Sequence, residues 1–189
     1  MRKIAICLIS LLFLSPVRAG GNPGEEESKQ KSTRAVQLYN TGYLMTLMGR
    51  YKEAIRLFEK SLEIQPTAEA YTYKGWTYSH MGDNKWAIEE AEKAIRIDPD
   101  FGNPYNDIGV YLIELGREDE AIPYLEKAMD AKRYCCYQFP HFNMGSIYLK
   151  KKMYGKAMEE FKKSLEIDPD YVPAREALKI LKESGLEET

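Results

Sequence analysis

The chain has 189 residues, a formal net charge of −2 at pH 7 and a hydrophobic fraction of 44%, which is ordinary for a folded domain. Its 27 basic residues are spread along the chain and are slightly outnumbered by 29 acidic residues, so binding to a phosphate backbone would gain little from counterion release. The composition therefore argues against a nucleic-acid partner and against a chain that is disordered throughout.

The first 19 residues have the organisation of a secretory signal peptide. A basic start at Arg2 and Lys3 precedes a mostly apolar run over residues 4–14, and Val-Arg-Ala at 17–19 forms a small-x-small cleavage site. The apolar run is much shorter than the roughly 20 residues that a membrane-spanning helix needs. We therefore predict export across the inner membrane to the periplasm or the outside, with no stable membrane anchor after cleavage.

Residues 20–34 are expected to form a flexible leader, because this polar stretch has no apolar period with which to bury surface. From residue 34 onward, apolar residues recur at three- and four-residue steps, for example over residues 54–62. Each such segment has one apolar face, as an amphipathic helix does. No strand pattern occurs, so the folded part of the chain is predicted to be all α-helical.

The helical part repeats itself. Four alanines recur at steps of 33, 34 and 36 residues, namely Ala54, Ala87, Ala121 and Ala157. A glycine lies twelve residues before each of them, at Gly42, Gly75, Gly109 and Gly145. Because small residues let two antiparallel helices approach closely, each Gly and Ala pair is predicted to form the contact within one helical hairpin. Larger side chains are expected to fill the space between hairpins, including Phe58, Leu125 and Phe161.

Proline and glycine mark the ends of these helices. Prolines lack a backbone donor and restrict the preceding residue, so the second helices are predicted to end near Pro66, Pro99 and Pro169. The turn inside three of the hairpins is predicted at Gly49, Gly82 and Gly116. The third unit departs from this pattern, because it has Arg133 in place of the proline, and Pro123 inside its second helix predicts a bend or a restart.

This period, with its Gly, Tyr, Ala, aromatic and Pro landmarks, resembles the tetratricopeptide repeat over about residues 35–171. The resemblance implies an all-α, right-handed solenoid of four helix-turn-helix repeats with a C-terminal capping helix. The repeats would be residues 35–67, 68–101, 102–137 with an extended loop, and 138–171, followed by the capping helix and tail at 172–189.

The resemblance also implies protein binding, because solenoids of this family present the inner face of their first helices as a concave groove. Aromatic side chains there offer a large contact area, and Asn side chains can hydrogen-bond the backbone of an extended or helical peptide. The groove candidates implied by the resemblance are Tyr39, Asn40, Tyr43, Thr72, Tyr73, Trp76, Asn106, Asp107, Val110, Phe142, Asn143 and Ser146.

No phosphate loop, dinucleotide fingerprint, nucleophile elbow or zinc-protease motif occurs in the sequence. We therefore expect no enzymatic activity, no cofactor and no metal ion. The predicted function is that of an exported scaffold or adaptor whose partner is a protein or a peptide.

Other functions remain open. A thiol- or metal-handling protein could use Cys135, Cys136 and His141, although adjacent cysteines are poorly placed for a tetrahedral metal site and a disulfide between them would close a strained ring. Free thiols or an intermolecular bridge are therefore expected, and packing between helices would explain His141. Family members with signal peptides include pilotin-like factors of type IV pilus assembly, so an envelope or pilus assembly factor is a second alternative, but Cys7 does not supply their lipid-bearing cysteine. A third is a protein that self-assembles through its repeat ends.

Overall fold

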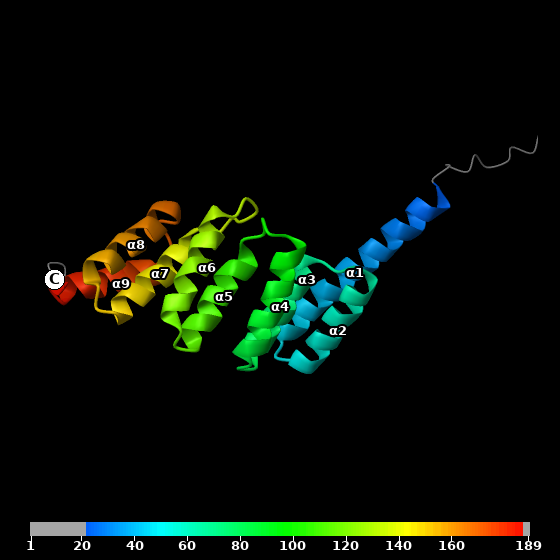
Figure 1. The fold of residues 1–189 in the computed structure, drawn as a ribbon, viewed down its shortest axis with the longest axis horizontal. Helices are drawn as coiled ribbons and strands as arrows, with labels where there is room; N and C mark the ends of the chain where they lie inside the picture. The colour runs from blue at the N-terminus through cyan, green and yellow to red at the C-terminus, as the bar shows by residue number, and fades with distance from the viewer. Residues whose placement is uncertain (1–21, 187–189) are drawn as a thin grey trace, which may run out of the picture.

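The computed structural model describes residues 22–186 of the chain, and the predicted signal peptide lies outside this range. Figure 1 shows helical hairpins stacked side by side along the long axis of the molecule, with α1 and α9 at opposite ends. This arrangement confirms the predicted all-α solenoid of four hairpins and a closing helix. The helices of the described part are α1 Pro23–Leu47, α2 Tyr51–Ile64, α3 Ala68–His80, α4 Asn84–Ile97, α5 Asn103–Glu114, α6 Glu118–Asp130, α7 Gln138–Lys150, α8 Tyr154–Ile167 and α9 Val172–Glu183.

The turns inside the hairpins follow the glycine pattern. The backbone is left-handed at the three predicted glycines, where φ is 73° at Gly49, 83° at Gly82 and 72° at Gly116. This conformation costs glycine little because it has no Cβ. The fourth hairpin makes the same turn without glycine, at Lys152 with φ of 60°.

The predicted restart at Pro123 does not occur. Helix α6 runs without interruption from Glu118 to Asp130, and the proline side chain is exposed on its surface. Pro123 is the sixth residue of α6, so it removes one hydrogen bond of the helical ladder, and the remaining bonds continue the helix on both sides.

Within the hairpins, three of the four repeat glycines lie nearest to large side chains. A Cβ on Gly109 would lie 2.5 Å from Cδ2 of Leu125, and a Cβ on Gly145 would lie 2.6 Å from Cδ1 of Phe161. Gly42 meets a phenylalanine in the same way, namely Phe58. These side chains therefore fill the interior of three hairpins, where the sequence pattern predicted a Gly and Ala contact.

Gly75 makes the predicted contact with its alanine more closely than Gly109, whose Cβ would lie 3.7 Å from the carbonyl oxygen of Ala121. A Cβ on Gly75 would lie 2.9 Å from the carbonyl oxygen of Ala87. The second helix of this hairpin has Ala91 where its neighbours have Phe or Leu. With no bulky side chain between them, the two backbones approach each other directly.

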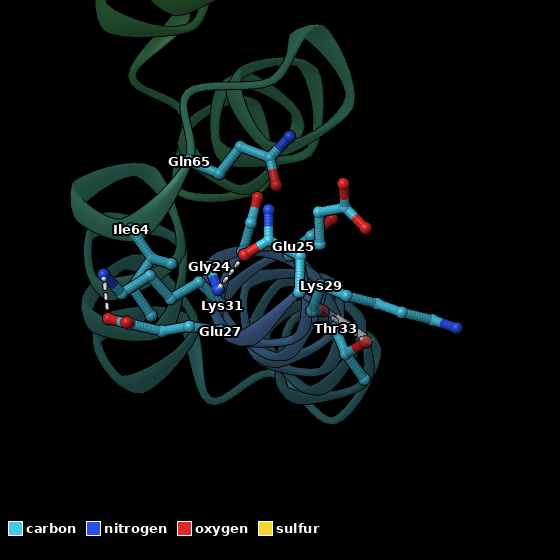
Figure 2. Close-up of a pocket in the computed structure, with 11 residues that line it drawn as sticks. Gly24, Glu25, Glu27, Lys29, Lys31, Thr33, Ile64 and Gln65 are labelled. Atoms are coloured by element: carbon cyan, nitrogen blue, oxygen red, sulfur yellow. Dashed lines mark hydrogen bonds and ion pairs between the residues drawn. The ribbon is translucent and has the colours of Figure 1, made fainter. Parts of the chain in front are cut away.

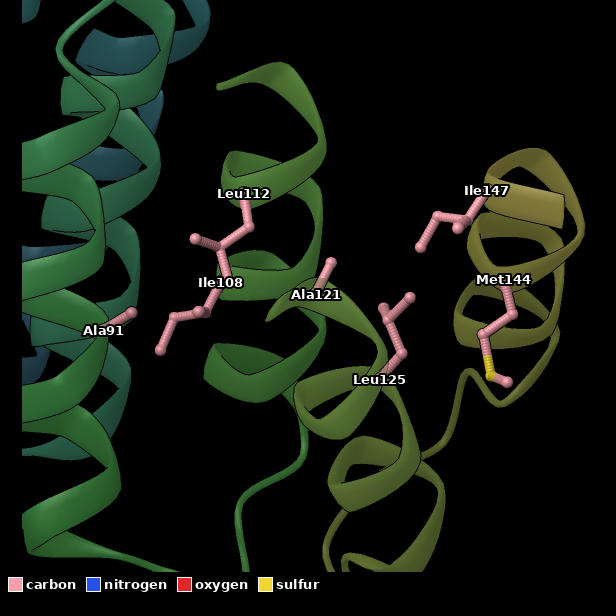
Figure 3. Packing of buried hydrophobic residues seen from close by; sticks show 7 residues of the cluster. All are labelled: Ala91, Ile108, Leu112, Ala121, Leu125, Met144 and Ile147. Atoms are coloured by element: carbon pink, nitrogen blue, oxygen red, sulfur yellow. The ribbon is translucent and has the colours of Figure 1, made fainter. Parts of the chain in front are cut away.

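The hydrophobic core runs through consecutive hairpins, as Figure 3 shows for the middle of the solenoid. One cluster joins α4, α5, α6 and α7 through Ala91, Ile108, Leu112, Ala121, Leu125, Met144 and Ile147. A second cluster closes the C-terminal end, where α9 covers α8 with Ala174, Leu178 and Leu181. The molecule is therefore held together by contacts between neighbouring helices along its length.

The expectation that the whole leader is without regular structure is wrong, because α1 begins at Pro23. Asn22 caps the helix by accepting a backbone N–H through its side chain, and proline is well suited to the first helical position. Glu27 and Lys31 add an ion pair one turn apart, with 2.9 Å between Oε1 and Nζ. Local capping and pairing thus form helix in a segment that buries little apolar surface.

Candidate functional site

Four of the predicted binding residues form a row of aromatic rings across α1 and α3. Tyr73 stacks on Tyr39 with 6.2 Å between ring centroids and packs against Tyr43 at 5.0 Å. Tyr43 in turn stacks on Trp76 at 5.7 Å. Tyr39 and Tyr43 are one helical turn apart on α1, and Tyr73 and Trp76 are three residues apart on α3, so the helical period places each pair on one face. All four side chains remain partly exposed.

Two rings that were not among the predicted residues extend this row. His80 makes an edge contact with Trp76 at 4.3 Å, and Tyr51 stacks on His80 at 6.1 Å. His80 lies four residues after Trp76, and this helical spacing could have indicated from the sequence that the two rings share one face of α3. Tyr51 begins α2 and joins the row only because the hairpin turn brings it there. These six residues are called the aromatic strip: Tyr39, Tyr43, Tyr51, Tyr73, Trp76 and His80.

Carboxylates lie near the middle of the aromatic strip. Burial raises the pKa of Tyr73, and smaller effects in the same direction come from Tyr43, Tyr39 and the carboxylates of Glu69 and Asp107. The Tyr73 hydroxyl therefore stays protonated at neutral pH and can donate a hydrogen bond.

Asp107 on α5 has an unusual protonation equilibrium. Burial raises the pKa of Asp107 to about 7, although a hydrogen bond with the Asn106 side chain acts in the opposite direction. Near neutral pH this side chain therefore exists both as a carboxylate, which only accepts hydrogen bonds, and as a carboxylic acid, which also donates one.

The remaining predicted binding residues differ in their surroundings. Nδ2 of Asn143 donates to Oδ1 of Asn106 at 3.0 Å, which links α7 to α5. Phe142 packs against Phe161 and Tyr171, with centroids 5.5 Å and 5.4 Å away, and so belongs to the C-terminal core. These contacts give Phe142 a packing role that the alignment of repeats did not predict.

Two predicted residues use their hydroxyl groups inside their own helices. Thr72 is 5% exposed and donates to the carbonyl oxygen of Ala68 at 2.8 Å, and Ser146 donates to the carbonyl of the residue four positions earlier at 2.9 Å. Asn40 is exposed on α1 and Val110 is partly exposed on α5. The structure therefore gathers four of the five aromatic members of the predicted set around α1 and α3 and gives several other members packing roles.

The alternative metal site of Cys135, Cys136 and His141 is not assembled. Nδ1 of His141 lies 2.7 Å from Oε2 of Glu160 on α8, so this ring is engaged in a contact between helices. Across residues 22–186, no group of three or more His, Cys, Asp or Glu side chains is arranged to hold a metal ion. In the same range, none of the helices combines the length and the apolar character that crossing a bilayer requires.

A polar hollow lies where the start of α1 passes the link between α2 and α3. Figure 2 shows Ile64 and Gln65 beside the first turns of α1, together with the ion pair of Glu27 and Lys31. The α1 side chains that line it, such as Glu25 and Lys29, are exposed. Mobile charged side chains are poorly suited to hold a ligand in one orientation, so the aromatic strip is the stronger candidate site.

Comparison with known proteins gives the same repeat pattern. Three models of the tetratricopeptide repeat match the chain, over residues 34–100, 103–135 and 140–171. The small glutamine-rich tetratricopeptide repeat-containing protein 2 of Mycosarcoma maydis is 30% identical over 104 residues, which are 54% of this chain and 30% of that protein. The chain thus spans less than a third of the length of this relative.

A second relative matches almost the whole chain. The type IV pilus assembly protein PilF of Pseudomonas aeruginosa is 28% identical over 205 aligned residues, covering 98% of this chain and 81% of PilF. A solved structure of Pseudomonas aeruginosa PilF superposes with a TM-score of 0.67 and 26% identity, covering 79% of this chain and 74% of that structure. From the repeat models, the helical hairpins and these similarities, we conclude that the chain belongs to the tetratricopeptide repeat family.

Proposed function

We propose that this protein is a non-catalytic scaffold or adaptor that binds a segment of a partner protein along the inner face of its first helices. The observation that carries the proposal is the aromatic strip, because its rings are held in place by one another while remaining partly exposed. The membership of the tetratricopeptide repeat family supports a role in protein binding.

The physical argument concerns the cost of binding. Rings that are already packed lose little conformational freedom when a partner covers them, so more of the contact energy remains as affinity. Tyr and Trp also combine a large apolar area with a polar group at the edge of the ring. The tyrosine hydroxyls of the strip can therefore hydrogen-bond a peptide backbone while the rings cover its apolar side chains.

The pattern of residues 1–19 supports export of the protein, and with it a partner in the periplasm or outside the cell. We propose the same location for the binding event. Fusing residues 1–19 to a reporter enzyme that is active only after export would test this step independently of the strip.

A cross-linking pull-down from the exported fraction tests the binding site. The wild type is compared with a triple variant, Tyr43→Ala, Tyr73→Ala and Trp76→Ala, whose helix content is checked by circular dichroism. The matched control is Trp86→Ala, which removes the other tryptophan, 53% exposed on α4 and outside the strip. We expect the wild type and the control to capture the same partner and the folded triple variant to lose it.

Once the partner segment has been identified by mass spectrometry, its affinity is measured by fluorescence anisotropy with a labelled peptide. Loss of a central aromatic contact typically weakens binding by about 2 kcal/mol or more, which is roughly thirtyfold in Kd. Equal affinities of the wild type and the triple variant would show that the strip is not the binding site and would direct attention to other surfaces.

A narrower candidate is an assembly factor for a type IV pilus or another part of the cell envelope. The match to PilF over nearly the whole chain favours it. Expressing this chain in a Pseudomonas aeruginosa strain that lacks PilF, and counting surface pili by electron microscopy, tests the idea. Restored pili would support this narrower function, whereas an expressed and folded chain that restores none would argue against it.

A further inference from the structure

Cys135 and Cys136 lie in the loop between α6 and α7, and neither takes part in the proposed binding site. Their Sγ atoms are 2.8 Å apart, and both cysteines are free thiols. Cys135 is exposed to solvent, whereas Cys136 is partly buried. The loop therefore presents one accessible thiol with a second thiol directly beside it.

Arg133, two residues before Cys135, anchors the loop. The backbone N–H of Arg133 donates to the carbonyl of Asp100 at 2.8 Å, and its own carbonyl accepts from the N–H of Gly102 at 3.1 Å. Its guanidinium donates to Asp98 from Nε at 2.9 Å and to Glu69 from Nη1 at 2.7 Å. These contacts tie the loop to the ends of α3, α4 and α5 and restrict its movement.

The tyrosines on either side of the cysteines are also held. Tyr134 packs so closely on Gly102 that a Cβ there would lie 2.5 Å from the Cβ of Tyr134. The ring of Tyr137 meets that of Tyr134 edge-on at 5.3 Å, and its hydroxyl donates to the carbonyl of Ala131 at 3.1 Å. Anchors on both sides keep the two thiols together, so their proximity is a property of the folded loop.

We propose that Cys135 and Cys136 form a reversible redox site that a low-molecular-weight disulfide oxidises to a disulfide between the two neighbouring residues. The Cys135 thiolate attacks one sulfur of the external disulfide, forms a mixed disulfide and displaces the first small thiolate, which takes up a proton. Cys136 then gives up its proton, attacks the Cys135 sulfur and displaces the second small thiol. Two protein thiols thus lose two electrons and two protons, and the external disulfide becomes two thiols.

The environment of the two sulfurs sets this order of attack. Burial raises the pKa of Cys136 to about 11, and the hydrogen bond with Cys135 acts in the same direction. Because the thiolate is the attacking form, Cys136 is a poor first nucleophile at neutral pH, and the exposed Cys135 is the accessible one. In the second step the mixed disulfide is already beside Cys136, so attack within the loop competes favourably with attack by a second protein molecule.

The resulting bond is suited to reversible chemistry. Neighbouring Cα atoms across a trans peptide bond are about 3.8 Å apart, which is below the roughly 4.4–6.8 Å usual for disulfides. The strain makes such a bond easier to reduce, and the very small ring it closes removes little freedom from the unfolded chain. Oxidation is therefore expected to be readily reversed by excess thiol and to add little stability.

The experiment uses the full chain with Cys7→Ser, which leaves only this pair of the three cysteines. The reduced protein is incubated at pH 8 with oxidised glutathione, and intact mass and non-reducing electrophoresis are measured over time. We expect the loss of two hydrogen atoms per chain, a monomeric species, and full reversal by excess reduced glutathione. A lasting glutathione adduct, a disulfide-linked dimer or unreacted thiols would each overturn the proposal.

Two single variants test the order of attack. With Cys136→Ser, Cys135 should accumulate as the glutathione adduct because no second thiol can resolve it. With Cys135→Ser, the remaining Cys136 should react at least about tenfold more slowly than Cys135 does in the Cys136→Ser variant. The reason is that Cys136 is partly buried and its thiolate is disfavoured. Equal rates for the two variants would show that the two sulfurs are not differentiated and would reject the assigned order.

Discussion

At the scale of single residues, the chain uses helical glycines in two different ways. Gly109 on α5 faces Leu125, which is fully buried, and a Cβ added there would lie 2.5 Å from Cδ2 and 2.8 Å from Cγ of that side chain. On α8, a Cβ at Gly155 would meet no atom within 4 Å other than those of its chain neighbours and of its own helix backbone. The first glycine makes room for the core, and the second does not.

The same substitution at these two positions should therefore have opposite effects. Gly109→Ala should lower the free energy of unfolding by about 1–3 kcal/mol, because the core must shift to admit the methyl group. Gly155→Ala should raise it by about 0.5–1 kcal/mol, because alanine restricts the unfolded chain and favours helix. Urea denaturation followed by circular dichroism measures both, and effects of the same sign would contradict the packing described for Gly109.

Asp107 makes stability depend on pH in a direction opposite to that of most carboxylates. Its folded pKa of about 7 is above the ordinary value of 3.8, so the folded state holds the proton more tightly than the unfolded state does. The stability that Asp107 contributes to the folded state is fully present below its ordinary pKa of 3.8, and it is lost as pH rises through about 7.

Replacing Asp107 by Asn should remove this dependence. Between pH 5 and pH 8, the free energy of unfolding of Asp107→Asn should rise by about 1–2 kcal/mol relative to that of the wild type. This value is smaller than the full pKa difference would give, because the side chain is partly exposed. Urea denaturation at the two pH values measures the gain. Asp130→Asn, at an exposed site at the end of α6, is the control and should show no such trend.

At the scale of elements, α1 consists of two parts with different support. Its C-terminal half packs against α2 and α3 and contributes the buried residues Ala35 and Thr46. Side chains over residues 24–31 are exposed, and this part relies on its cap and on local ion pairs. Helix without tertiary cover opens easily, since isolated helices of this length are marginal in water.

Amide hydrogen exchange should separate the two parts of α1. Amides of residues 27–33 should exchange with opening free energies of about 0–2 kcal/mol, whereas those of residues 54–62 in α2 should require several kcal/mol. Asn22→Ala, which removes the cap, should speed exchange in the first part further and leave α2 unchanged. Equal protection of the two segments would indicate that another surface covers the start of α1.

At the scale of the whole molecule, each hairpin contacts its neighbours in chain order, so stability is a sum of local units and the interfaces between them. Both tryptophans lie in the second hairpin, Trp76 on α3 and Trp86 on α4. Tryptophan fluorescence therefore reports on the N-terminal half of the solenoid, whereas circular dichroism reports on all of it.

A substitution in the last helix should affect these two probes unequally. Leu181 is 2% exposed, so Leu181→Ala should lower the free energy of unfolding of the C-terminal end by about 2–4 kcal/mol. The circular dichroism transition should therefore shift more than the fluorescence transition. Ile180→Ala is the matched control, because this neighbour is 60% exposed and should change stability by about 0.5 kcal/mol or less. Equal shifts of the two probes would show that the solenoid unfolds as a single unit.

The sequence by itself determined the features that depend on local spacing. The helical period, the repeat of small residues and the glycines at left-handed turns predicted the hairpins and their order, and α9 was predicted as the closing helix. The family resemblance named Tyr73 and Trp76 among the groove residues, and the structure places their rings in one row. These features follow from a period of 3.6 residues and from backbone conformations that few residues adopt.

Only the tertiary structure decided which side chains meet. The turn between α1 and α2 brings Tyr51 to His80, the C-terminal core takes up Phe142, and the anchored loop holds Cys135 beside Cys136. A repeat pattern states which face of a helix is apolar, but the contact that each side chain makes depends on the size of its neighbours on other helices. Those neighbours differ from hairpin to hairpin, so equivalent positions in the repeats have different surroundings.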